Sequence, residues 1–188
     1  DAPFNPVSLA IGAEASFVAR TVDSDRKHLT EVLRQAAEHP GTALVEIYQN
    51  CNIFNDGAFE VLKDKDQAEE AVIRLEHGQQ IRFGADRAKG VVRDAATGDL
   101  TVVPVTPENE ADILVHDAHQ ASPTTAFALS RLADPDTLHH TPIGVFRSVD
   151  RPVYDTLMSD QLDTAIEQNG KGDLGALLAG KDTWTVVG

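Results

Sequence analysis

The spacing of apolar residues along the first fifty positions predicts a strand, a helix and a second strand. An apolar stretch over 16–22 predicts the first strand, and four apolar residues between Leu29 and Ala36 fall on one face of a helix. A second apolar stretch over 42–49 is rich enough in apolar residues to predict a strand buried on both faces. This order is the crossover unit of a parallel sheet, so we predict an α/β fold.

Capping signals define the ends of the early helices. Asn5 can accept a hydrogen bond from a free amide, and Pro6 is tolerated at a first helical position, which together predict a short helix over 8–13. Asp23 and Ser24 predict the start of the next helix, and Pro40–Gly41 predicts its end.

The pattern changes near Phe59, where the crossover unit gives way to hairpins and short elements. We expect helices over 66–75, 123–132 and 153–167, a β-hairpin formed by 89–94 and 99–105, and strands over 112–116 and 143–147. This change divides the chain into residues 1–58 and 59–188. The apolar residues of 170–188 predict a tail that docks on another surface.

The composition argues against proteins that bind nucleic acid and proteins that span a membrane. A net charge of −14, with 16 scattered basic residues, argues against nucleic acid as a partner. No apolar run approaches the roughly 20 residues of a membrane-spanning helix. A single cysteine rules out an internal disulfide and suits a reducing cytoplasm.

That cysteine is the main candidate for chemistry. Cys51 follows the predicted strand 42–49 and lies between Asn50 and Asn52, in a polar setting. Carboxyl ends of strands in α/β sheets are where cofactors bind, and a reactive or metal-binding thiol needs such an exposed position. A buried, inert cysteine is the alternative. One cysteine cannot hold a metal cluster alone, so partner ligands would come from elsewhere.

Two histidine pairs are weaker candidates. His116 and His119 are three residues apart, but no third ligand has suitable spacing, which favours a polar loop at a strand end. His139 and His140 lie in a loop rich in Asp and Pro, which predicts a solvated turn. The sequence contains no phosphate-binding P-loop and no nucleophile elbow.

Several stretches resemble one enzyme family. The strings Asn5–Ala13 and Val45–Asn55, together with Pro142–Arg147 and Asp182–Val186, resemble the β subunit of 2-oxoacid:ferredoxin oxidoreductases, most nearly the actinobacterial-type 2-oxoglutarate enzymes. The resemblance covers essentially the whole chain. The segment from Gln49 to Asn55 is its most specific part.

The resemblance implies a fold, a set of cofactors and partners. Residues 1–58 would be the second half of a parallel-sheet domain that binds thiamine diphosphate, and 59–188 a smaller mixed α+β extension. The family converts a 2-oxoacid and coenzyme A to an acyl-CoA and passes electrons through a 4Fe–4S cluster to ferredoxin. The other partner would be an α subunit, in a cytoplasmic complex.

Cys51 matches the family cysteine that is the last of four cluster ligands. The resemblance places the other three cysteines, and the Gly-Asp-Gly motif for Mg²⁺ and the diphosphate, before Asp1, so we expect this piece to be inactive alone. It assigns no catalytic residue here. Asn50, Asn52 and Asn55 would shape the Cys51 loop, which asparagine also does in ordinary turns.

A second hypothesis remains open. The chain could be a non-catalytic α/β assembly module, with Cys51 in its core and the C-terminal half as a docking surface.

Overall fold

The computed structural model describes residues 4–184, 186 and 188, so Asp1–Pro3, Thr185 and Val187 lie outside the described residues. The chain forms two compact units, residues 1–151 and 152–188. The helices are α1 (Pro6–Gly12), α2 (Arg26–Glu38), α3 (Lys65–Ala71), α4 (Thr124–Ser130), α5 (Tyr154–Asn169) and α6 (Leu174–Ala179). The strands are β1 (Phe17–Val22), β2 (Ala43–Tyr48), β3 (Val72–Leu75), β4 (Arg82–Phe83), β5 (Lys89–Arg93), β6 (Leu100–Pro104) and β7 (Thr141–Ser148).

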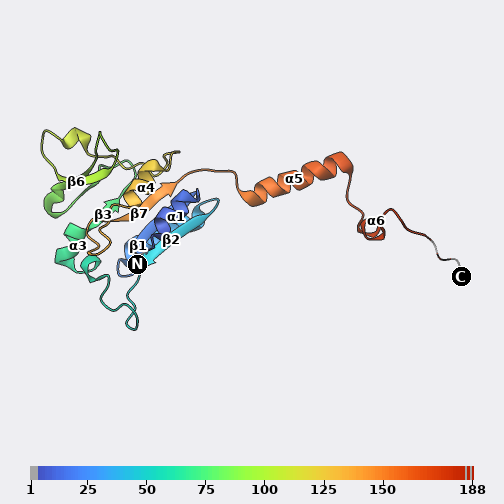
Figure 1. Cartoon of the computed structure of the whole chain (residues 1–188), viewed down its shortest axis with the longest axis horizontal. Helices are drawn as coiled ribbons and strands as arrows, with labels where there is room; N and C mark the ends of the chain where they lie inside the picture. The colour runs from blue at the N-terminus through green and yellow to red at the C-terminus, as the bar shows by residue number, and fades with distance from the viewer. Residues whose placement is uncertain (1–3, 185, 187) are drawn as a thin grey trace. The chain divides into compact units, whose positions relative to one another are not determined.

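A four-stranded sheet in the order β2-β1-β7-β3 forms the centre of the first unit (Figure 1). Strands β1 and β2 are parallel and are joined through α2, as the crossover pattern predicted. Strand β7 runs antiparallel to β1 and parallel to β3. The prediction of an α/β fold with a parallel sheet core is therefore confirmed, and β7 makes the complete sheet mixed.

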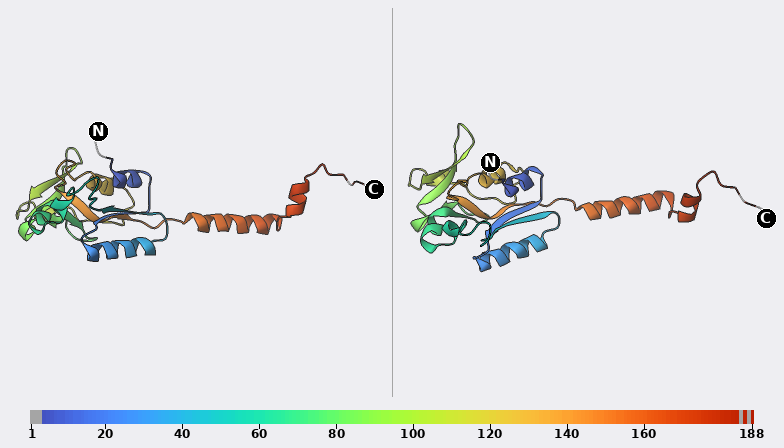
Figure 2. Two further views of the ribbon diagram at one scale, coloured as in Figure 1. Left: turned by 90° about the horizontal axis from the view of Figure 1, so that it is seen from below. Right: turned by 60° about the horizontal axis from the view of Figure 1, so that its bottom comes forward.

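Helices cover both faces of this sheet (Figure 2). Because successive side chains of a strand point to opposite faces, Val18 packs with α1 and α4, whereas Phe17 and Ala19 pack with Val32 of α2. All six residues of β1 are buried. The core on the α1 side also includes Phe83 and Val91 of the three-stranded antiparallel sheet β4-β5-β6.

Four sequence predictions were wrong. The second helix is capped by Asp25, whose side chain accepts from the amide of His28, and not by Asp23 or Ser24. Strand β2 is partly exposed because it lies at the edge of the sheet, so it is not buried on both faces. The segment 66–75 does not form one helix, because β3 pairs with β7 from Val72 onward. The segment 112–116 makes an isolated bridge between Gln80 and Val115 and a 3₁₀ turn over Glu110–Asp112, and no strand.

Other elements match their predictions. The hairpin is β5 and β6, the strand 143–147 is β7, and the helices at 123–132 and 153–167 are α4 and α5. Within α4, Leu129 is buried whereas Phe127 is exposed.

The two sides of the division at residue 58 share the central sheet, because β3 and β7 extend the pair β1–β2. The assignment of 1–58 to a thiamine-diphosphate domain and of 59–188 to an extension stays a prediction. So does docking of the tail, whose residues Leu174, Leu177, Leu178 and Trp184 are exposed in the chain. Among the described residues, no helix combines the length and apolar content needed to cross a membrane.

Candidate functional site: the Cys51 loop

The candidate site is the loop that follows β2, at the carboxyl end of the parallel pair β1–β2. The Asn50 side chain organises this loop. Its Nδ2 donates to Oδ1 of Asn52 and Oδ1 of Asp56, each at 2.9 Å, and its Oδ1 accepts from the amide of Gly57 at 2.9 Å. The prediction that asparagines shape this loop is thus confirmed for Asn50 and Asn52.

The start of the loop is held to the end of β1. The amide of Asp23 donates to the carbonyl of Tyr48 at 3.0 Å. Burial of the Asp23 carboxyl opposes its ionisation. The Lys63 ammonium, 3.0 Å away, and hydrogen bonds including one from the backbone of Asn50 outweigh burial and lower the pKa of Asp23. Asp23 is therefore an anion that links the loop to the sheet.

Backbone amides of the loop favour ionisation of the Cys51 thiol. Hydrogen bonds from the amides of Phe54, Ile53 and Asn55 lower the pKa of the Cys51 thiol, against a smaller opposing effect of desolvation. The loop is closed by the Asn55 amide, which also donates to the Cys51 carbonyl at 2.9 Å. The thiol is free and partly exposed. A thiolate held among amides at a strand end can bind a metal ion or act as a nucleophile.

The loop fits one ligand of a metal cluster and cannot supply a complete site. Within the described residues, no three His, Cys, Asp or Glu side chains are grouped so as to hold a metal ion. Amide donors around a thiolate are the surroundings that iron–sulfur ligands use, because they stabilise the negative charge on sulfur. Ile53 and Phe54 expose 84% and 89% of their surface, so the tip of the loop presents apolar side chains outward.

A cavity of about 380 Å³ lies beside the strand that leads to Cys51. Its lining includes Arg20, Glu46, Tyr48, Phe59 and Arg131. Arg20 is 2% exposed, and its Nε donates to Oε2 of Glu46 at 2.5 Å. Its guanidinium also lies over the ring of Tyr48, which stacks on Phe59 with ring centroids 4.6 Å apart.

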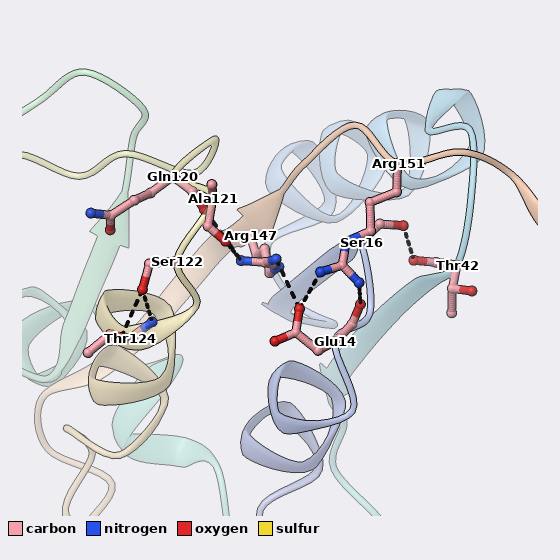
Figure 3. A network of polar contacts seen from close by, with 9 residues as sticks. All are labelled: Glu14, Ser16, Thr42, Gln120, Ala121, Ser122, Thr124, Arg147 and Arg151. Carbon is pink, nitrogen blue, oxygen red and sulfur yellow. Dashed lines mark hydrogen bonds and ion pairs between the residues drawn. The ribbon is translucent and has the colours of Figure 1, made fainter.

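We did not identify Arg20 from the sequence as a buried, paired residue. The sequence contains a signal for it, because Arg20 is a charged residue within an apolar strand and a buried charge requires a partner. Arg147 in β7 gives the same signal. Its Nη1 donates to the carbonyls of Gln120 and Ala121 at 3.4 and 3.1 Å, and its Nη2 lies 3.5 Å from Glu14 (Figure 3).

Glu14 and Arg147 lie at the opposite end of β1 from Cys51, because Glu14 precedes this strand. The guanidinium of Arg151 also contacts Glu14 there. It pairs with the Glu14 carboxylate and donates to the Glu14 carbonyl at 3.1 Å (Figure 3). This network therefore lies within the first unit, away from the cysteine loop.

Within the part of the chain that the structure describes, neither histidine pair belongs to a group of three side chains that could hold a metal ion. His116 is buried and its Nε2 bonds the carbonyl of Val145 at 2.7 Å, whereas Nδ1 of His119 bonds the carbonyl of Ser148 at 2.6 Å. Burial lowers the pKa of His116. The segment is a loop, as interpreted, but it follows none of the described strands, and His116 is buried in the core.

Comparison with known proteins finds relatives that are subunits of 2-oxoacid oxidoreductases. No protein-family model matches the chain. It is 50% identical to the 2-oxoglutarate oxidoreductase subunit KorB of Mycobacterium tuberculosis over 194 aligned residues, which cover 99% of this chain and 49% of that protein. It is 27% identical to the 2-oxoacid:ferredoxin oxidoreductase subunit beta of Saccharolobus solfataricus over 114 residues, 56% of this chain and 36% of the relative.

A solved structure supports the fold. The 2-oxoglutarate:ferredoxin oxidoreductase from Magnetococcus marinus, with 2-oxoglutarate, coenzyme A and succinyl-CoA bound, matches with a TM-score of 0.51. Sequence identity is 20%, and the match covers 93% of this chain and 42% of that one. The chain spans about half the length of the mycobacterial relative.

Proposed function

Because the chain is homologous to the β subunits of 2-oxoacid:ferredoxin oxidoreductases, we propose that it is part of such a subunit and serves the oxidative decarboxylation of 2-oxoglutarate. In this reaction the bond between the carboxylate and the carbonyl carbon breaks and CO₂ leaves. The acyl group passes to the thiol of coenzyme A, and an electron pair is released to ferredoxin. The proposed complex includes an α subunit and lies in the cytoplasm, where a single reduced cysteine is stable.

The observation that carries this proposal is the free, partly exposed Cys51 in the loop directly after β2, in a chain so similar to such a subunit. When bound, thiamine diphosphate with Mg²⁺ would supply the electron sink for decarboxylation, and a 4Fe–4S cluster would accept electrons singly. We assign Cys51 as one thiolate ligand of that cluster. No residue of this chain is assigned to thiamine diphosphate, because the sequence lacks a Gly-Asp-Gly motif.

The chain's own residues would act on the ligand and its surroundings. The amides of Ile53, Phe54 and Asn55 would stabilise charge on the Cys51 sulfur and so tune the potential of the cluster. Asn50 holds the conformation of the loop that contains these amides. The exposed Ile53 and Phe54 would help to exclude water once the rest of the enzyme covers them.

The proposal is tested by turnover of the complete enzyme. The full-length β subunit, purified without oxygen together with its α subunit, is assayed for reduction of a viologen dye with 2-oxoglutarate and coenzyme A. We expect reduction that requires both compounds and is slower with pyruvate. An iron-loaded complex that fails to reduce the dye with any 2-oxoacid would contradict the proposal and favour the non-catalytic module.

A further inference from the structure

The second compact unit, residues 152–188, is called here the C-terminal arm. Its helix α5 carries five large apolar side chains at intervals of one, three or four residues, which place them on one side of the helix. These residues, the α5 stripe, are Tyr154, Leu157, Met158, Leu162 and Ile166, and they are 40–76% exposed. None of the described arm residues is buried.

The exposed apolar surface continues beyond α5. In α6, Leu174, Leu177 and Leu178 are 68–78% exposed, and Trp184 is 84% exposed. Scattered apolar residues on a surface are ordinary, but a series of this length on one short segment indicates a surface that another molecule covers.

The charge of the arm argues against a membrane as that partner. Helix α5 contains four acidic residues and no Lys or Arg. Of these, Asp160, Asp163 and Glu167 lie on the side opposite the α5 stripe, given 3.6 residues per turn. Helices that lie on membranes carry Lys and Arg on the polar face, which attract anionic lipids. An acidic polar face would be repelled.

A second copy of the chain is also a poor partner. Helix α5 has 16 residues, fewer than the roughly three to four heptads, or about 21 to 28 residues, of apolar repeat that indicate a coiled coil. The arm contains six acidic and two basic residues, within a chain of net charge −14. Like charges would therefore oppose pairing of arms, and also binding of an arm to the body of another copy.

The residue that precedes the arm is held within the first unit. Arg151, the last residue of the first unit, donates to the carbonyl of Glu14 at 3.1 Å and also pairs with its carboxylate (Figure 3). The arm thus begins from a fixed point on the folded unit. A fixed attachment raises the effective concentration of a tethered binding element near any partner bound to that unit.

We propose that the arm binds the α subunit of the enzyme, by placing the α5 stripe in a preformed apolar groove whose rim carries Lys or Arg. This is the helix-in-groove mode of recognition, in which residues such as Leu157 and Leu162 fill pockets. The acidic residues on the other side of α5 would face the basic rim. The inference rests on the proposed function, since it takes the chain to be one subunit of a multi-subunit enzyme.

A matched pair of variants tests the proposal in the full-length subunit. Leu162→Asp places a charge within the α5 stripe, and Thr156→Asp places the same charge on the polar side of the same helix. Tagged β subunit is co-expressed with the α subunit, and the amount of α subunit recovered per β subunit is measured. We expect Leu162→Asp to lower recovery at least tenfold and Thr156→Asp to leave it within twofold.

Three other results would overturn the proposal. Equal recovery with both variants would show that the stripe does not bind the α subunit. A lower melting temperature of the Leu162→Asp subunit alone would place the arm against its own subunit. Loss of β–β association with retained α subunit would make the partner a second copy. Turnover and iron content of the wild-type complex, measured in parallel, show separately whether the proposed function holds.

Discussion

The buried ion pair between Arg20 and Glu46 offers the sharpest test of how the strand before Cys51 is held. The two side chains are 2% and 15% exposed, with Nε and Oε2 2.5 Å apart. Removing one partner of a buried pair costs about 3–5 kcal/mol, because a charge is left without compensation. In Glu46→Gln the guanidinium keeps its contacts with the rings of Tyr48 and Phe146, whose centroids lie 5.1 and 5.4 Å away.

These ring contacts are present in both proteins and cancel in the comparison, whereas the glutamine side chain keeps an oxygen that can accept from Nε. Glu46→Gln should therefore lower the free energy of unfolding by about 3 kcal/mol, the lower end of that range. The double variant Arg20→Met/Glu46→Leu removes both charges and should cost less than the sum of the single changes. Urea unfolding followed by circular dichroism measures both. A loss below about 0.5 kcal/mol for Glu46→Gln, or strictly additive single changes, would refute this reasoning.

Two further predictions concern the strand β7 and pH. Gly144→Ala should cost at least about 2 kcal/mol, since φ is +117° and a Cβ would lie 2.7 Å from the carbonyl oxygen of Leu75. Gly78→Ala, at φ +77° with open space around it, should cost only about 1 kcal/mol; equal losses in urea unfolding would contradict this. Burial lowers the pKa of His116, so the folded state binds fewer protons than the unfolded state below about pH 6.5, and stability should fall as pH falls through that region. His116→Gln should reduce this pH dependence in the same unfolding measurement, and an unchanged slope would show that His116 does not contribute.

Local signals predicted the elements that depend on neighbours in sequence. Asn5 accepts the amide of Ser8 and starts α1, as expected from its capping chemistry. The crossover of β1, α2 and β2 followed from apolar spacing alone. Strand β3 was missed because Val72–Leu75 continues a helical pattern, and its parallel pairing with β7, about seventy residues later, overrides that local preference.

The sequence predicted where the candidate site lies in the fold, but only part of its chemistry. The sequence placed Cys51 after a strand in a polar loop. The lowered pKa of its thiol depends on how the backbone of 53–55 turns toward the sulfur, which no residue pattern specifies. Arg20 and Glu46 are paired across two strands, 26 positions apart in sequence, so their contact could not be predicted from local spacing.

The central claim is that Cys51 binds iron. Iron and acid-labile sulfide are counted per full-length subunit, purified without oxygen, and the reduced cluster is recorded by electron paramagnetic resonance. The comparison is Cys51→Ser against Phe54→Ala, which removes an exposed side chain of the same loop but keeps the backbone amide. We predict that Cys51→Ser loses iron or shows an altered, oxygen-labile signal, whereas Phe54→Ala keeps the wild-type iron content. Wild-type iron content and signal in Cys51→Ser would contradict the assignment.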